Sequence, residues 1–318
     1  MTGRPAAKQT GRFAPSPTGS LHAGSLLAAV GSYLDARAAG ARWLVRIEDL
    51  DTARVIPGCA DEMLRTLEAY GFEWDGEVIH QSTRTAAYRE ALTTLSAAHR
   101  TFHCSCSRKD LAGDVGDDAA AYPGTCRAGP TKAGPTAVRF RVSDQPVSFD
   151  DLFLGSQTFD LRALGDFVVE RRDRLASYQL AVVVDDAWQG VTRVVRGADL
   201  LASTPWQIDL QAALGLARPI YGHLPLLVEP GGKKLSKSDR AIPIPAPAPP
   251  GSLRSNHRSD LLAVSHALTS TLTHLSHSPP PGLADSSIKD VWKWAFAHWK
   301  PQVLAGRARV ELSAVSDK

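Results

Sequence analysis

The first group of candidate functional residues lies near the start of the chain, in the segment 12–25. Its sequence, Arg-Phe-Ala-Pro-Ser-Pro-Thr-Gly-Ser-Leu-His-Ala-Gly-Ser, places two prolines and a glycine before an expected helix. Small residues such as Gly24 let a flat ring or a phosphate approach the backbone, and the N–H groups of a helix N-terminus attract negative charge. His22 could donate to a phosphate oxygen there. In isolation, so short a segment more often holds a histidine that caps the helix or packs.

A second segment with phosphate-binding character lies at residues 234–238. Its sequence is Lys-Leu-Ser-Lys-Ser, and two glycines precede it. Lys234 and Lys237 could follow the moving charge on a triphosphate, and glycines let a loop close over it. Alone, this would be a solvated basic loop, but together the two segments predict ATP binding.

A third group of residues could bind a metal ion. Three of the four cysteines, Cys104, Cys106 and Cys126, are clustered, whereas Cys59 is interpreted as a small buried residue. Three thiolates would fill most of a tetrahedral zinc shell, and spacing alone suggests His103 or a water as the fourth ligand. Three free thiols without metal are the alternative. A structural role is favoured over a catalytic one because the cluster lies in an apparent insert.

The pattern around the first segment predicts a β-α-β unit that positions it. Residues 12–14 are expected to be a short strand, 22–39 a helix and 42–48 a buried strand. Strand ends of a parallel sheet meet at one edge, where ligands bind in open α/β folds. Glu48 and Asp49 should therefore lie beside the first turn.

The rest of the chain is expected to alternate helices and strands, with an irregular stretch at 110–135. The long apolar run 178–185 is predicted to be a central strand. Helices are expected at 61–70, 88–98, 204–215, 259–275 and 287–303, and strands at 138–142 and 167–170. The expected domains are the first half of the catalytic core at 1–98, an inserted lobe with the metal site at 99–176, the second half of the core at 177–240, and a proline-rich linker with a short helical tail at 241–318.

The two phosphate-binding segments resemble the paired motifs of class I aminoacyl-tRNA synthetases. Within that family, residues 12–19 resemble the glutamyl branch, and the resemblance from about Gly11 to Arg240 is to its short glutamyl-Q subfamily, which lacks an anticodon-binding domain. It implies an α/β fold with a Rossmann-like, doubly wound parallel sheet, a zinc-bearing insert and a short helical tail. It also implies that L-glutamate and ATP, with Mg²⁺, form glutamyl-adenylate, and that glutamate passes to the queuosine base at the wobble position of tRNA(Asp).

The resemblance further implies a role for each residue of the site. His22 and Lys237 would be catalytic, and ATP would be bound by His22, Gly24, Lys234 and Lys237. Glutamate would be bound by Arg12, Phe13, Ala14, Pro15, Ser16, Glu48, Tyr178 and Arg196, where the planar guanidinium of arginine suits a carboxylate. One structural Zn²⁺ would be bound by Cys104, Cys106, Tyr122 and Cys126. Ser25 stands where many class I synthetases have a second histidine, and no direct role is expected for it.

Bulk properties leave the main alternatives open. A formal charge of +3 over 318 residues neither supports nor excludes tRNA binding. The 80 residues after Ser238 are too few for the large anticodon-binding region of full glutamyl-tRNA synthetases. The rival interpretations are a compact glutamyl-tRNA synthetase that charges the tRNA 3′ end, a nucleotidyltransferase, and a non-catalytic, zinc-stabilised RNA-binding relic. With no signal-peptide core and no membrane-spanning run, a cytoplasmic protein is expected, and no obligate protein partner is evident.

Overall fold

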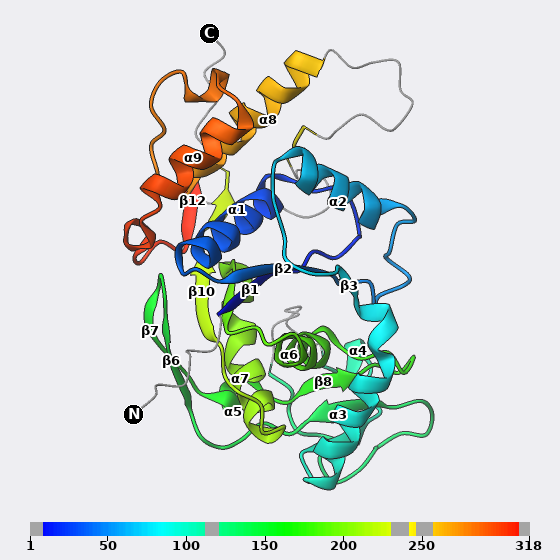
Figure 1. Cartoon of the computed structure of the whole chain (residues 1–318). Helices are drawn as coiled ribbons and strands as arrows, with labels where there is room; N and C mark the ends of the chain where they lie inside the picture. The colour runs from blue at the N-terminus through cyan, green and yellow to red at the C-terminus, as the bar shows by residue number, and fades with distance from the viewer. Residues whose placement is uncertain (1–8, 112–120, 230–241, 246–256, 312–318) are drawn as a thin grey trace, which may run out of the picture.

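The computed structural model describes residues 9–111, 121–229, 242–245 and 257–311 (Figure 1). A largely parallel sheet lies at its centre. Its first part has the order β1-β2-β3, formed by Thr10–Phe13, Arg42–Ile47 and Ile79–His80. Its second part has the order β9-β10-β6-β7, formed by Arg193–Gly197, Ile220–Leu224, Val147–Asp151 and the antiparallel edge strand Gly155–Phe159.

The two parts of the sheet meet between β1 and β9. The backbone N–H of Thr192 donates to the carbonyl of Thr10 at 2.9 Å, just before β9 begins. The chain therefore changes direction across the sheet at β1 and β9, so the carboxyl ends of these strands flank a topological switch point. This arrangement confirms the expected α/β fold with a parallel sheet.

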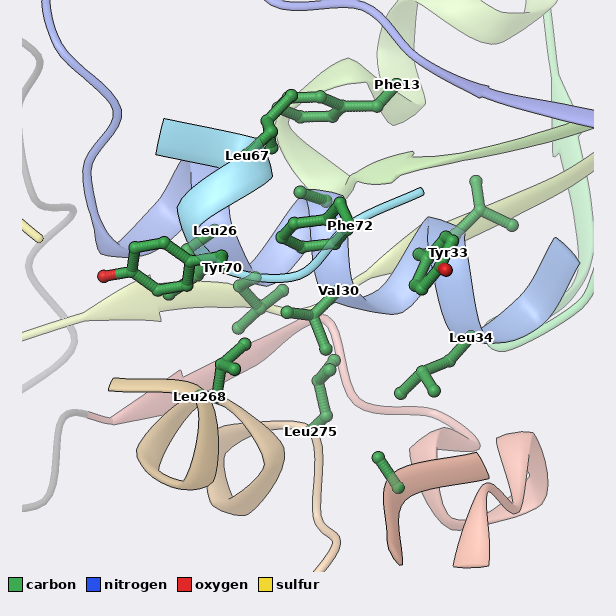
Figure 2. Close-up of a cluster of buried hydrophobic side chains, with 14 of the residues drawn as sticks. Phe13, Leu26, Val30, Tyr33, Leu34, Leu67, Tyr70, Phe72, Leu268 and Leu275 are labelled. Atoms are coloured by element: carbon green, nitrogen blue, oxygen red, sulfur yellow. The ribbon is translucent and has the colours of Figure 1, made fainter. Parts of the chain in front are cut away.

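Helices cover both faces of this sheet (Figure 1). On one face lie α1 (Ala23–Ala38), α2 (Cys59–Ala69), α8 (His257–His274) and α9 (Ile288–His298). On the other face lie α3 (Thr85–Ala97), α6 (Tyr178–Trp188) and α7 (Thr204–Ala213). Figure 2 shows α1 at the centre of the first layer, with Leu268 and Leu275 of the tail directed at Val30. Within the described ranges, no helix has both the length and the hydropathy needed to cross a bilayer.

The prediction of a central strand at 178–185 is wrong, because this run forms the helix α6. Ser177 caps it by accepting the backbone N–H of Leu180. Leu180, Val182 and Val183 are all buried, so a continuous apolar run covers the helix on several sides. Such a run has no periodicity that separates a buried helix from a buried strand. The helix continues to Trp188, and the next strand along the chain is β9.

The insert folds as a small antiparallel sheet, which confirms the strands expected near 138–142 and 167–170. It consists of β4 (Thr101–Cys104), β5 (Ala137–Phe140) and β8 (Phe167–Glu170) in the order β4-β5-β8. Short helices flank it, namely α4 (Arg108–Leu111) and α5 (Leu161–Leu164).

The tail joins the main core and contributes a strand as well as the expected helices. The indole Nε1 of Trp292 donates to the carbonyl of Tyr70 at 2.8 Å, and the Trp292 ring meets Tyr33 edge-on at 5.0 Å. A short strand, β12 (Arg309–Glu311), pairs in parallel with β11 (Leu226–Val228). The remaining elements are the 3₁₀ helices η1 (Gln81–Arg84), η2 (Ala198–Ser203), η3 (Leu283–Asp285) and η4 (Pro301–Leu304).

Candidate active site and cysteine cluster

A cavity of about 240 Å³ lies where β1, β2 and β9 end and α1 begins. Among the residues predicted to bind ATP or glutamate, those that line it are Arg12, Phe13, Ala14, His22, Gly24, Glu48, Tyr178 and Arg196. Pro15 and Ser16 do not line it, although the carbonyl of Pro15 accepts the backbone N–H of Glu48 at 2.9 Å and so fixes the turn beside it. Lys234 and Lys237 fall outside the described residues.

Strand alternation explains how the cavity acquires its charged groups. Successive side chains of a strand point to opposite faces of the sheet. Phe13 therefore packs into the same apolar core as the residues of α1 (Figure 2), whereas Arg12 reaches Asp186 on α6. Arg46 on β2 lies on the same face as Arg12 and also bonds Asp186.

His22 is both a helix cap and part of the cavity wall. Its Nδ1 accepts the backbone N–H of Ser25 at 3.3 Å at the start of α1. A neutral imidazole whose Nδ1 accepts must carry its proton on Nε2, which makes Nε2 a hydrogen-bond donor. The helix-cap interpretation and the phosphate-donor interpretation are thus compatible. A Cβ added at Gly24 would lie 3.1 Å from Cε1 of the His22 ring, so a larger residue at position 24 would crowd the imidazole.

Arg196 is a buried cation whose protein partners are all neutral. Only 5% of it is exposed. Its Nε donates to His223 Nε2 at 3.3 Å, its Nη2 to Thr204 Oγ1 at 2.8 Å, and its Nη1 to the Tyr178 hydroxyl at 3.5 Å. Among the described residues, no carboxylate lies within 4.0 Å of this guanidinium. Because a buried charge is costly without a counter-charge, the site is suited to an anionic ligand.

A network of four charges lies beside Arg196, and sequence reasoning missed two of its members. Asp186 Oδ1 accepts from Arg12 Nε at 3.2 Å and from Arg46 Nη1 at 2.8 Å, and Arg46 Nη2 reaches Glu48 Oε1 at 3.4 Å. Arg46 lies within a buried strand, and Asp186 directly follows the run that the sequence predicts to be a strand, so neither was expected at the site. The doublet of aspartates at the end of that apolar run was the available signal.

The pKa values in this network follow from burial and from the opposing charges. Burial alone would raise the pKa of Asp186, but the adjacent guanidinium groups of Arg12 and Arg46 hold it below its usual value. Burial raises the pKa of Glu48, against the opposing effect of Arg46 and Arg12. Desolvation also raises the pKa of Tyr178, so its hydroxyl stays a neutral phenol. The cavity therefore offers the cations Arg12 and Arg196 and, beside Arg12, the carboxylate of Glu48.

The remaining lining residues carried no distinguishable sequence signal. Apart from Ser25 and Asp199, they have small or apolar side chains. These lining residues are Ala23, Ser25, Leu27, Ala28, Val195, Gly197, Asp199, Leu200, Pro225, Leu226, Leu227 and Ile242. Ile242 follows the lysine-rich segment in sequence, and its carbonyl accepts the backbone N–H of Ala23 at 3.0 Å. The chain therefore returns to the start of α1 directly after residues 230–241.

The three clustered cysteines form a group that could hold one metal ion. The sulfur atoms of Cys104, Cys106 and Cys126 all lie within 4.8 Å of one another, and the Sγ atoms of Cys106 and Cys126 are 3.6 Å apart. Tetrahedral ligands at a zinc–sulfur distance of about 2.3 Å would be separated by somewhat under 4 Å. The described thiols are therefore already near the spacing that a tetrahedral ion needs.

Tyr122, rather than His103, approaches the three thiols. Its hydroxyl lies 3.5 Å from Cys104 Sγ and 3.9 Å from Cys106 Sγ, and it accepts the backbone N–H of Cys126 at 2.7 Å. His103 neighbours Cys104 on β4, so its side chain points to the opposite face, where it bonds Thr136.

The thiols of this cluster have unequal acidity. Burial opposes ionisation of Cys126, but hydrogen bonds from Ser105, Tyr122 and Thr131 lower its pKa to about 5. Burial and the neighbouring thiols of Cys126 and Cys104 raise the pKa of Cys106 to about 11. The arrangement thus presents one thiolate and further thiols that a bound cation would deprotonate.

Comparisons with known proteins agree with this geometry. The family model described as the catalytic domain of class I tRNA synthetases (E and Q) matches residues 8–245. The chain is 50% identical to the glutamyl-Q tRNA(Asp) synthetase of Geobacter sulfurreducens, over 92% of this chain and 93% of the relative. It is also 50% identical to the glutamyl-Q tRNA(Asp) synthetase of Dechloromonas aromatica, over 91% of this chain and 93% of the relative.

The solved structures that resemble the chain agree on the fold. A glutamate tRNA ligase from Elizabethkingia meningosepticum, in complex with its amino acid, superposes with a TM-score of 0.77 at 24% identity, covering 96% of this chain and 67% of the other. A methionyl-tRNA synthetase from Mycobacterium tuberculosis superposes with a TM-score of 0.54 at 14% identity, covering 83% of this chain and 64% of the other.

Proposed function

We propose a specific reaction for this chain, which belongs to the family of class I glutamyl and glutaminyl tRNA synthetase catalytic domains. It is an aminoacyl-tRNA synthetase-like ligase. ATP activates L-glutamate to glutamyl-adenylate without tRNA, and the glutamyl group then passes to the queuosine base at the wobble position of tRNA(Asp). Similarity over nearly the full length of relatives named glutamyl-Q tRNA(Asp) synthetase supports the second step. ATP and tRNA are both cytoplasmic, and we place the protein there.

The observation that carries the choice of amino acid is the buried guanidinium of Arg196. It faces the cavity with neutral protein partners, so the side-chain carboxylate of glutamate would supply its missing counter-charge. Glutamine has the same size but no charge. Glu48, which lines the cavity and pairs with Arg46, would bind the α-ammonium group of the substrate.

The start of α1 would hold the phosphates. The Nε2 proton of His22 can donate to an oxygen of the α-phosphate, and the positive end of the α1 dipole favours its charge, while a carboxylate oxygen attacks phosphorus and pyrophosphate leaves. Lys234 and Lys237, proposed on the basis of the sequence motif alone, would follow the leaving pyrophosphate. Mg²⁺ bound to the triphosphate would neutralise part of its charge.

Glutamate-dependent exchange between ATP and pyrophosphate tests this proposal. With the purified chain and no tRNA, we expect exchange with glutamate and none with glutamine or aspartate. Exchange that appears only when tRNA is added would favour a compact glutamyl-tRNA synthetase acting at the tRNA 3′ end. No exchange under either condition would favour the RNA-binding relic.

The pH dependence of glutamate binding should reveal the ionisation of Glu48. Only the carboxylate form can pair with an ammonium group, and burial raises the pKa of Glu48. The KM for glutamate should therefore rise as the pH falls, starting above the pH at which an ordinary glutamate is protonated. In Glu48→Gln the KM should be high at every pH and lack this step. The same pH step in both proteins would contradict the assignment, and the KM for ATP serves as the internal control.

We also propose that the cysteine cluster holds one structural Zn²⁺ through Cys104, Cys106, Cys126 and Tyr122. The apolar cluster around it is small, consisting of Phe102 and Tyr122 with the cysteines and Leu111 at its edge. So little apolar surface stabilises a lobe weakly, and a bound metal would make up the difference.

Replacement of Cys104 by serine should remove the zinc and lower the melting temperature by about 5 °C or more. The glutamate KM should change less, because the cluster lies apart from the cavity lining. Metal content by atomic emission and thermal unfolding would measure both effects. Cys59→Ser is the matched control, since Cys59 is equally buried but packs in the main core. A Cys104→Ser protein with full zinc content, or with unchanged stability after zinc loss, would refute the structural site.

A further inference from the structure

A buried chain of hydrogen bonds runs from β6 to the cavity wall. Asp151 Oδ2 bonds Nδ1 of His223 at 2.5 Å, and His223 Nε2 accepts from Nε of Arg196 at 3.3 Å. The side chains of Asp151 and His223 are fully buried, and neither lines the cavity. Arg196 is the member of the chain that reaches the cavity.

The hydrogen bonds determine the tautomer of His223. Asp151 Oδ1 accepts three backbone N–H groups, from Phe153 and Leu154 at 3.0 Å each and from His223 at 3.1 Å. An ionised carboxylate is an acceptor only, so His223 must carry its proton on Nδ1. Nε2 then carries a lone pair that accepts from Nε of Arg196 at 3.3 Å, and the hydroxyl of Thr204, itself a partner of Arg196, lies 3.0 Å from the same nitrogen. Burial lowers the pKa of His223, which keeps the ring neutral.

The same contacts select which edge of the guanidinium faces the ligand. Nε and Nη2 form one edge, and His223 and Thr204 occupy it. Nη1 points toward the hydroxyl of Tyr178, a cavity residue. The end formed by Nη1 and Nη2 is therefore presented to a ligand, and it can bind a carboxylate at two places.

The order of the groups matters as much as their geometry. If a carboxylate contacted Arg196 directly, it would neutralise the guanidinium and compete with an anionic substrate. A neutral imidazole orients the guanidinium without neutralising it, and the carboxylate that orients the imidazole lies one group farther away. Because its protein partners are neutral, the positive charge of Arg196 remains available to attract an anionic ligand.

We propose that Asp151 and His223 are positioning residues that hold Arg196 ready for the substrate carboxylate and thereby set the preference for glutamate over glutamine. This inference rests on the proposed function, in which Arg196 binds the side chain of glutamate. It concerns two residues outside the cavity, so it can fail while that function holds.

Asp151→Asn is the decisive variant. The amide can still accept the backbone N–H groups through Oδ1, but its Nδ2 donates to Nδ1 of His223 and drives the ring proton to Nε2, against the N–H of Arg196. The glutamate KM in ATP–pyrophosphate exchange should rise about tenfold or more, and the preference for glutamate over glutamine should fall by a similar factor. The KM for ATP should change less than about twofold, as expected of a residue that acts on one substrate only.

Two variants of His223 keep the test decisive if Asp151→Asn fails to fold. His223→Gln retains a donor for Asp151 and an acceptor for Arg196, whereas His223→Leu retains neither. We expect the glutamine variant to preserve most of the preference for glutamate and the leucine variant to lose it. Nitrogen NMR of labelled histidine should show Nδ1 protonated in the unmodified protein and Nε2 protonated in Asp151→Asn.

Asp209→Asn is the matched control, because Asp209 is a buried carboxylate that pairs with Arg100 at 3.0 Å away from the cavity. It should leave the glutamate KM unchanged. An unaltered glutamate KM and preference in folded Asp151→Asn, or equal behaviour of the two His223 variants, would overturn the inference while glutamate-dependent exchange by the unmodified chain upheld the proposed function. Loss of exchange in the unmodified chain would overturn both.

Discussion

Replacement of Arg196 by alanine should lower kcat/KM for glutamate by about a thousandfold and abolish the preference over glutamine. A bidentate pair between a buried guanidinium and a carboxylate makes two charge-assisted hydrogen bonds, and a thousandfold corresponds to about 4 kcal/mol. Glutamine gains nothing from the cation, so its weak reaction should change little. Steady-state exchange kinetics with both amino acids would measure the two values.

Arg193→Ala is the matched control for this prediction. Arg193 lies on the same strand as Arg196 but pairs with Asp35 at 2.8 Å, outside the cavity. Its loss should reduce stability without altering the preference for glutamate. An Arg196→Ala enzyme that still prefers glutamate would show that another group recognises the carboxylate.

Asp186→Asn should be among the most destabilising single changes in the chain. Asp186 is the carboxylate shared by Arg12 and Arg46, whose side chains are 4% and 0% exposed. The substitution keeps the shape but leaves two buried guanidinium groups without this counter-charge, which costs about 3–5 kcal/mol for a broken buried pair. Urea unfolding would report the loss as a lower midpoint with an unchanged slope.

A partly exposed ion pair provides the comparison for Asp186→Asn. Glu170 pairs with Arg174, whose side chain is 67% exposed. Glu170→Gln should therefore cost about 1 kcal/mol or less. If the two variants lose similar stability, the buried network is not the source of the stabilisation.

Local patterns in the sequence were sufficient to predict most of the elements around the site. The β-α-β unit at the start of the chain needs only an apolar strand, a rigid turn and a helix-forming stretch, all of which depend on neighbouring residues. The structure confirms these elements as β1, α1 and β2. The resemblance to class I synthetases implied that Arg12, Glu48 and Arg196 would meet, and all three line one cavity.

The partners of those residues could not be predicted in the same way. Arg46 and Asp186 are 140 positions apart in sequence, and their contact depends on how α6 packs against β2. The apolar run that forms α6 was predicted to be a strand because a stretch buried on several sides lacks the hydrophobic periodicity that distinguishes a helix from a strand. The direction in which the Asp186 side chain points depends on its place in the helix α6. The wrong prediction of a strand therefore also hid its position in the site.

The order of amino acids is enough to identify the groups capable of this chemistry, namely His22 at a helix start, arginines near strand ends and three clustered thiols. The state of each group depends on the folded chain. Packing made Nδ1 of His22 an acceptor, brought Tyr122 rather than His103 to the cysteines, and surrounded Arg196 with neutral partners. The physical reason is that protonation, tautomer and charge balance depend on burial and on contacts between distant segments, which no local pattern contains.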